Sequence, residues 1–166
     1  MKNDLVVTLP IKQFMLMEHC PPNWRVLDLY LFRDKDLVFY VGQSYVAFDR
    51  VWEHIRNGFR GRSAIGRFIL SNWPKSLNYQ IDLLSSQASQ FAPIQHNLNL
   101  AEADLIQRWS PCFNHALNHQ PTPLPDQYIS PSAPLRGSRN LHKLMREAER
   151  AVKAEERRRW LAILEP

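Results

Sequence analysis

Two short apolar runs, separated by four charged residues, constrain the fold of this chain more than any other feature. Residues 27–32 alternate leucine with polar and aromatic residues, which predicts a strand with at least one buried face. Residues 33–36 are all charged and suit a turn, while residues 37–41 form the unbroken aliphatic and aromatic run that is typical of a central strand. The second run stops at Gly42, so the stretch predicts a β-hairpin.

This hairpin would bring two tyrosines beside the polar face of a helix. Tyr30 and Tyr40 lie on consecutive strands, and a turn near residues 34–35 places them within a few residues of register. Arg50 and His54 follow, four residues apart on the polar side of a predicted helix, so they point the same way. The apolar stripe of that helix consists of Phe48, Val51, Trp52, Ile55 and Phe59. Two phenols, an arginine and a histidine therefore converge at one edge of the predicted sheet.

The hairpin and its helix resemble the motif of the GIY-YIG nuclease family. Residues 28–30, Asp-Leu-Tyr, stand where the family has Gly-Ile-Tyr, and residues 40–42, Tyr-Val-Gly, stand where it has Tyr-Ile-Gly. Asp28 departs from the family glycine, which is a backbone feature and not a catalytic group. The resemblance covers roughly residues 24–116. It extends to four further positions: Arg50, His54, Glu102 and Asn114.

The resemblance implies both a fold and an activity. The fold is of the α/β class, α+β type, with a small three-stranded antiparallel sheet flanked by helices. The activity is that of a metal-dependent DNA endonuclease, which hydrolyses a phosphodiester by in-line attack of a water that an active-site tyrosine activates. Glu102 would hold one Mg²⁺ or Mn²⁺, since a lone carboxylate with several waters is how Mg²⁺ prefers to be bound.

The other motif positions receive roles from the same resemblance. Arg50 would bind the scissile phosphate through its planar guanidinium. One tyrosine would be the base, and we favour Tyr30, with Tyr40 as a positioning hydroxyl. His54 could orient the water, share the proton or hydrogen-bond Tyr40. Two residues would support the site: Gly42 and Asn114.

Taken one at a time, the same residues have ordinary structural explanations. A lone glutamate on a helix is usually a surface carboxylate, tyrosines are common in strands, and a histidine can be structural. The alternative to an enzyme is a non-catalytic nucleic-acid-binding or assembly subunit that retains the nuclease fold. DNA cleavage that requires both Mg²⁺ and Glu102 would separate the two hypotheses.

Composition divides the chain into four parts. Residues 1–23 are an N-terminal extension, with a short strand expected near residue 6 and a helix that starts behind Pro10. Residues 24–118 are the nuclease-like domain. Residues 119–138 are rich in proline and form a linker, and residues 139–166 form a long basic helix that lacks proline and glycine in its body.

Within the domain, three further elements follow the first helix. Gly58 is available to end that helix, and Ser63 can cap a short second helix. Residues 77–83 alternate apolar with polar residues and predict the third strand. A core-facing helix that carries Glu102 is predicted from Ile94, Leu98, Ala101, Leu105 and Trp109.

The chain is basic, with a net charge of +5 and a pI of about 9.5, which favours a polyanionic partner that we expect to be DNA. The C-terminal helix has a narrow apolar seam, so it could also serve a protein partner or self-association, or instead fold back over Trp73. The expected nucleic-acid contacts are Arg56, Arg60, Arg62, Arg67, Arg157, Arg158 and Arg159.

Two cysteines, Cys20 and Cys112, make a disulfide framework improbable. The N-terminus lacks the uncharged core of a signal peptide or membrane span, so we expect a cytoplasmic protein with no membrane partner. Cys112, His115 and His119 have the spacing of half a zinc site without a matching second pair, and no structural zinc is predicted.

Overall fold

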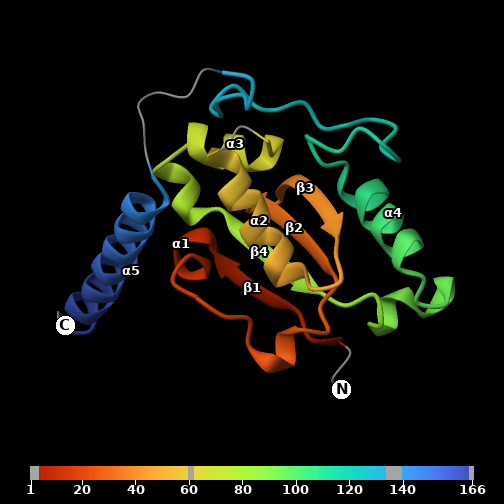
Figure 1. Ribbon diagram of the computed structural model, residues 1–166, viewed down its shortest axis with the longest axis horizontal. Helices are drawn as coiled ribbons and strands as arrows, with labels where there is room; N and C mark the ends of the chain where they lie inside the picture. The colour runs from red at the N-terminus through yellow and green to blue at the C-terminus, as the bar shows by residue number, and fades with distance from the viewer. Residues whose placement is uncertain (1–3, 60–61, 134–139, 165–166) are drawn as a thin grey trace.

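A four-stranded antiparallel sheet forms the centre of the molecule (Figure 1). The computed structural model describes residues 4–59, 62–133 and 140–164. The strand order is β1-β4-β2-β3. The strands are β1 (Val7–Pro10), β2 (Leu29–Asp34), β3 (Leu37–Gln43) and β4 (Gln80–Leu84). β2 and β3 are the predicted hairpin and β4 is the predicted third strand, so the α+β class is confirmed.

The fourth strand comes from the N-terminal segment that the sequence predicted as an extension. β1 pairs antiparallel with β4, with Val7 opposite Leu83. The helix that follows, α1 (Ile11–Phe14), is much shorter than expected, and it buries Ile11 and Phe14 completely. The prediction of three strands is therefore wrong. The short strand expected near residue 6 is present as β1, but its pairing with β4, which lies far along the chain, leaves no local pattern in the sequence.

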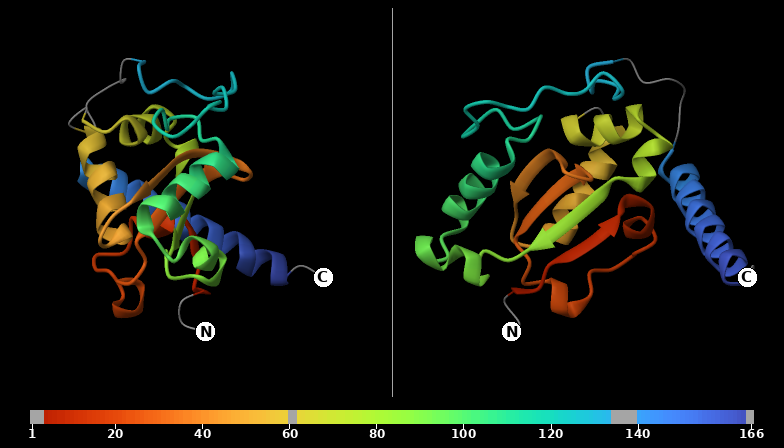
Figure 2. Two further views of the ribbon diagram at one scale, coloured as in Figure 1. Left: turned by 90° about the vertical axis from the view of Figure 1, so that its right-hand side faces the viewer. Right: turned by 180° about the vertical axis from the view of Figure 1, so that it is seen from behind.

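Helices cover both faces of the sheet (Figures 1 and 2). One face packs against α1, α2 and α3 over a core that includes Phe32 and Phe48, and the other packs against α4 over Leu31 and Leu105. Ser63 caps α3 as predicted, by accepting a hydrogen bond from the backbone N–H of Gly66. The helices are α2 (Ala47–Phe59), α3 (Ala64–Ser71), α4 (Leu98–Trp109) and α5 (Leu141–Leu164), with 3₁₀ turns η2 (Pro22–Trp24), η3 (Lys75–Asn78) and η4 (Ser89–Ile94).

A β-bulge in the hairpin decides which side chains reach the core. Phe32 lies opposite Tyr40, and Arg33 lies opposite Val38, so Phe39 is the extra residue of β3. Phe39 is completely buried, whereas Tyr40 keeps part of its surface exposed. The bulge therefore anchors β3 in the core next to a tyrosine that can still meet a ligand.

Two glycines allow α2 and α3 to approach each other closely. A Cβ at Gly66 would lie 2.1 Å from the backbone oxygen of His54, and a Cβ at Gly58 would lie 2.7 Å from the carbonyl carbon of Gly66. Gly58 lies inside α2 and does not end it, so that prediction is wrong. Glycine is needed at both positions because any side chain would separate the two backbones.

The proline-rich segment lies across the molecule next to α3 (Figure 1). Residues 119–133 contain no helix or strand, as expected of a linker, but they are bound to the domain. The Asn72 side chain donates to the backbone oxygen of Ile129 and accepts from its N–H, and the Tyr128 hydroxyl donates to Asp34 at 2.6 Å. The described part of this segment is therefore a strap over the core and not a free spacer.

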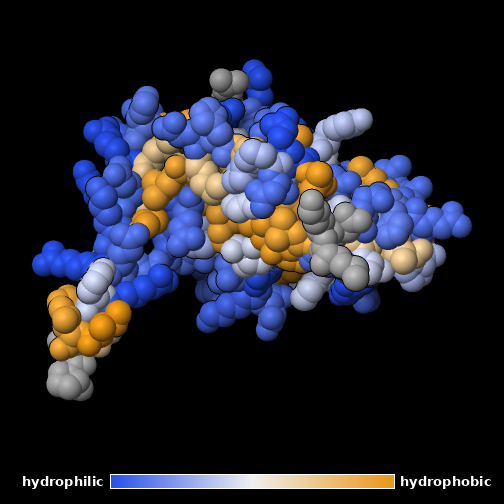
Figure 3. All heavy atoms as spheres, turned by 90° about the horizontal axis from the view of Figure 1, so that it is seen from below, coloured by the Kyte–Doolittle hydropathy of each residue, from blue (hydrophilic) through white to orange (hydrophobic). Residues whose placement is uncertain are grey.

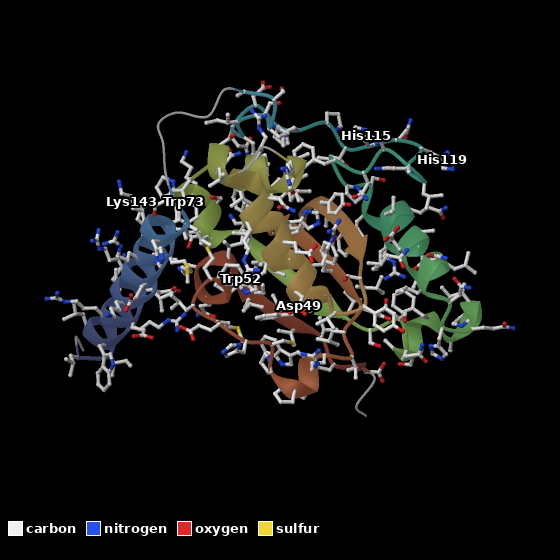
Figure 4. The ribbon with its side chains drawn as sticks, viewed as in Figure 1. Asp49, Trp52, Trp73, His115, His119 and Lys143 are labelled. Atoms are coloured by element: carbon white, nitrogen blue, oxygen red, sulfur yellow. The ribbon has the colours of Figure 1, made fainter. Side chains whose placement is uncertain are left out.

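The C-terminal helix α5 is present as predicted, and its first half belongs to the core. Leu144 and Ala148 are buried, and just beyond the midpoint of the helix Glu155 forms an ion pair of 2.6 Å with Lys12, which is itself buried. The indole N–H of Trp73 donates to Glu147, and Figure 4 shows Trp73 beside Lys143 at the start of the helix. The expectation that α5 stands outside the domain is therefore wrong for this half, because it folds back over Trp73.

The second half of α5 projects away from the body (Figures 1 and 3). Its end exposes four apolar side chains, among them Trp160 at 66% and Ile163 at 75% of their surface. None of the helices in the described ranges is long and apolar enough to cross a membrane.

Candidate functional site

The site is built on the face of the hairpin that carries Tyr30 and Tyr40. Their rings lie 6.2 Å apart between centroids. Tyr30 lies opposite Gly42 on β3, and a Cβ at Gly42 would lie 2.3 Å from both Cζ and the hydroxyl oxygen of Tyr30. Glycine at this position therefore makes the room that the Tyr30 ring occupies, which fits its predicted supporting role.

A buried hydrogen-bonded chain joins β2 to the two helices. The Tyr30 hydroxyl lies 2.8 Å from Nε2 of His54, and Nδ1 of His54 lies 2.8 Å from Oγ of Ser63. Tyr30, His54 and Ser63 are only 1%, 9% and 7% exposed. His54 therefore lies inside the molecule and contacts Tyr30, whereas the sequence placed it on a polar face and named Tyr40 as a partner.

The electrostatic state of His54 follows from this burial. Desolvation lowers the pKa of His54 to about 4, and the charge of Arg50 acts in the same direction. The imidazole is therefore neutral at pH 7, with one N–H to donate and one nitrogen to accept. A neutral histidine of this kind can hold a phenol in place or receive its proton.

Tyr40, Arg50 and His54 line a cavity of about 200 Å³ on the outer side of this chain. Asn57, Arg62 and Phe113 complete its walls, together with Ser63 and the first turn of α3. Arg50 is exposed and pairs with Glu53 at 2.6 Å on the same helix. Tyr30 is not among the lining residues, so Tyr40 is the phenol that faces the cavity.

Glu102, on α4, approaches the same tyrosines from the other side. It is half-buried, and burial raises the pKa of its carboxyl while the Gln43 amide opposes that rise. Burial also raises the pKa of both phenols; the Glu102 charge adds to this effect, and the Arg50 charge opposes it. Both tyrosines are thus electrostatic neighbours of Arg50 and of Glu102.

Asn114 closes the outer edge of β3. Its amide accepts from the backbone N–H of Val41 and donates to the Val41 oxygen, each at 2.9 Å. Asp28 has a similar task at the start of β2, because its carboxylate accepts from both the N–H and the hydroxyl of Ser86. The aspartate that replaces the family glycine therefore fixes the strand to the loop behind β4.

The arginines predicted as nucleic-acid contacts lie in different surroundings. Arg62 lines the cavity, whereas Arg56 lies over the Trp52 ring at 5.3 Å, and Arg67 donates to the Ala133 backbone oxygen. Arg60 lies outside the described residues. Arg157, Arg158 and Arg159 belong to the projecting end of α5, which lies away from α2 and α3 (Figure 1).

The donor set at Glu102 fits a hard divalent cation. It offers one half-buried carboxylate whose negative form is disfavoured by burial, and a cation would remove that penalty. Among the described residues there is no cluster of three or more His, Cys, Asp or Glu side chains that could hold a metal. His115 and His119 lie on the loop beyond α4 (Figure 4). Glu102 with water molecules is thus the ligand set that this site offers.

Sequence reasoning missed four residues of the site: Asn57, Ser63 as the partner of His54, Phe113 and Asp28 as a strand anchor. The first three come together only through the close approach of α2 and α3 and the return of the chain along β3. Such contacts carry no local signal, although a capping serine soon after a motif histidine could have suggested the second.

In comparisons with known proteins, no family model matches the chain, and no curated protein or solved structure reaches a significant match. Function must therefore be inferred from the arrangement of these side chains.

Proposed function

We propose that the protein is a GIY-YIG-type, metal-dependent DNA endonuclease. The observation that carries the proposal is the convergence, from four separate strands and helices, of two phenols, a neutral histidine, an arginine and a carboxylate. Residues that were merely common in strands or on helix surfaces would have no reason to gather in one region of the molecule.

Tyr40 is our candidate for the phenol that accepts the proton of the attacking water. It lines the cavity, whereas Tyr30 lies behind it, only 1% exposed and bonded to His54. This assignment reverses our preference from the sequence, since a base must reach the proton that it removes. Burial raises the pKa of Tyr40, so the phenol needs the nearby positive charge of Arg50 to act as a base.

Arg50 would bind the scissile phosphate. It reaches the cavity from α2, and its exposed ion pair with Glu53 is weak enough to exchange for a phosphate. Glu102 would hold one Mg²⁺ or Mn²⁺. When bound, such an ion neutralises charge that develops on the phosphate oxygens.

A plasmid-nicking assay tests the proposal. Nicking should appear with Mg²⁺ or Mn²⁺, disappear with EDTA, and fall at least about 1000-fold in Glu102→Gln, which corresponds to about 4 kcal/mol. DNA affinity of this variant should stay within about twofold, because the glutamate holds metal and not DNA. Asp104→Asn is the matched control, since this half-buried aspartate on α4 pairs with the exposed Arg108 on the same helix and should be dispensable.

A non-catalytic DNA-binding or assembly subunit is the second candidate. The burial of Tyr30 and the pairing of Arg50 with Glu53 favour it, because both side chains are already occupied. DNA binding without metal and without any nicking, by wild type and Glu102→Gln alike, would select this candidate.

A further inference from the structure

The cavity beside Tyr40 extends away from the catalytic carboxylate. Its far wall consists of Asn57, Arg62, Phe113 and the first turn of α3, while neither Tyr30 nor Glu102 lines it. A single phosphodiester held between Arg50 and Glu102 would leave Asn57, Arg62 and Phe113 unused. The cavity therefore has room for a second group of the substrate.

The charge of the cavity at pH 7 is positive. Arg50 and Arg62 both line it, no described lining residue is acidic, and the pKa of His54 is lowered to about 4 so that this side chain adds no charge. The guanidinium of Arg50 is shared with Glu53. Arg62 is thus the main source of unshared positive charge.

Arg62 is held in position by its backbone and free at its tip. Its N–H donates to the Asn57 oxygen at 3.0 Å, which closes the corner between α2 and α3. Within the part of the chain that the structure describes, its guanidinium has no hydrogen bond or ion pair. An arginine side chain that lines a positive cavity and has no partner among the described residues is suited to bind an anion from solution.

We propose that this cavity binds the phosphate of the nucleotide next to the scissile one, with Arg62 as its anion contact and Phe113 as the wall for its sugar or base. This subsite rests on the proposed nuclease function. Phe113 is half-buried against Phe39 and Phe68, so its ring is a fixed surface against which a nucleoside can pack. A phosphate in the second subsite would set the direction in which the cut strand crosses Tyr40.

The test is an NMR titration of the full chain, without metal, with sodium phosphate and with the 5′-phosphorylated dinucleotide pdTpdT. Saturable shifts are expected at the amides of Asn57, Ala64 and Ile65, with the dinucleotide binding more tightly than phosphate. Arg62→Gln should raise the Kd for the dinucleotide at least tenfold. Arg25→Gln removes the same charge from an exposed site outside the cavity and should change the Kd less than twofold.

A salt series on duplex DNA supplies the second readout. Arg62→Gln should reduce the slope of log affinity against log salt by about 1, whereas Arg25→Gln should leave it unchanged. Equal effects of the two variants, or shifts that avoid the cavity, would overturn the subsite. Phosphate binding at Arg62 in a protein that never nicks DNA would support the subsite while rejecting the nuclease. Nicking that depends on Glu102, with dinucleotide binding unaffected by Arg62→Gln, would reject the subsite alone.

Discussion

The buried and open sides of the candidate site differ in how firmly their side chains are held. On the buried side, Tyr30, His54 and Ser63 are linked by two hydrogen bonds of 2.8 Å and are almost fully enclosed. On the open side, Arg50 has an exposed ion pair, of the kind that contributes about 0–1 kcal/mol, and its side chain also interacts with Tyr30, while the Arg62 guanidinium has no partner among the described residues.

This difference separates the two tasks of the site. The buried side acquires its geometry when the protein folds, because helix packing and hydrogen bonds determine it together. The open side can exchange its contacts for those of a substrate at little cost. Substitutions on the buried side should therefore change stability, and substitutions on the open side should change chemistry or binding.

The strongest test of the buried side is Gly66→Ala. The new Cβ would lie 2.1 Å from the His54 oxygen, so α2 and α3 must separate and Ser63 must leave His54. We expect a loss of about 3 kcal/mol in the free energy of unfolding, measured with urea, and loss of nicking. Ala64→Ser, at an exposed position in the same turn, should cost less than about 0.5 kcal/mol. Equal stability of the two variants would show that the helix contact is not tight.

Low pH should destabilise the buried side of the site through protonation of His54. Its pKa is lowered from 6.5 to about 4 chiefly by burial, with Arg50 adding to the shift and Glu53 opposing it. At a pH between these two values, the unfolded chain therefore binds a proton at His54 that the folded protein does not bind. The contribution of His54 to the free energy of unfolding is fully present above pH 6.5 and is lost as the pH falls from 6.5 to about 4. The loss is about 3 kcal/mol at most.

Urea unfolding at a series of pH values measures this loss. His54→Gln cannot take up the proton, so its stability should vary less across that window than that of the wild type. An identical dependence of stability on pH in both proteins would mean that carboxylates alone cause the acid sensitivity.

The sequence predicted the parts of this site that local patterns encode. The hairpin, the capping serine and the positions of Tyr30, Tyr40 and Arg50 follow from alternation, charge and helical spacing, and the structure contains these elements. It predicted a short strand near residue 6 but not the pairing of that strand with β4, because the partner strand is distant in the chain. It also could not predict the Ser63–His54 contact, which depends on two glycines that let separate helices meet.

Arg50→Lys tests the open side. The charge is kept, but the planar fork that binds two phosphate oxygens is lost, so nicking should fall more than tenfold, or more than about 1.4 kcal/mol. The free energy of unfolding should stay within about 0.5 kcal/mol, because the side chain is exposed. Single-turnover nicking and urea unfolding measure the two quantities. Near-normal turnover in the variant would mean that Arg50 acts as a simple point charge or has no catalytic role.

Helix α5 shows the same difference between packed and exposed side chains within one element. Its first half packs Leu144 and Ala148 into the core, and Glu155 just beyond the midpoint pairs with the buried Lys12, whereas the end of the helix projects into solvent (Figure 3). Only the end of the helix should therefore be removable without loss of stability.

The smallest effect on stability should come from truncation after Glu156. This removes Arg157, Arg158 and Arg159 with the exposed apolar end but keeps every buried contact of the helix, so stability should change by less than about 0.5 kcal/mol. Leu144→Ala in the intact chain is the control for the packed half and should cost about 3 kcal/mol.

If the three arginines contact DNA phosphates, the truncation should also reduce the salt slope of duplex binding by as much as about 3. A truncated protein that unfolds, or one whose DNA affinity and salt slope match the full chain, would remove the proposed role of this end in binding.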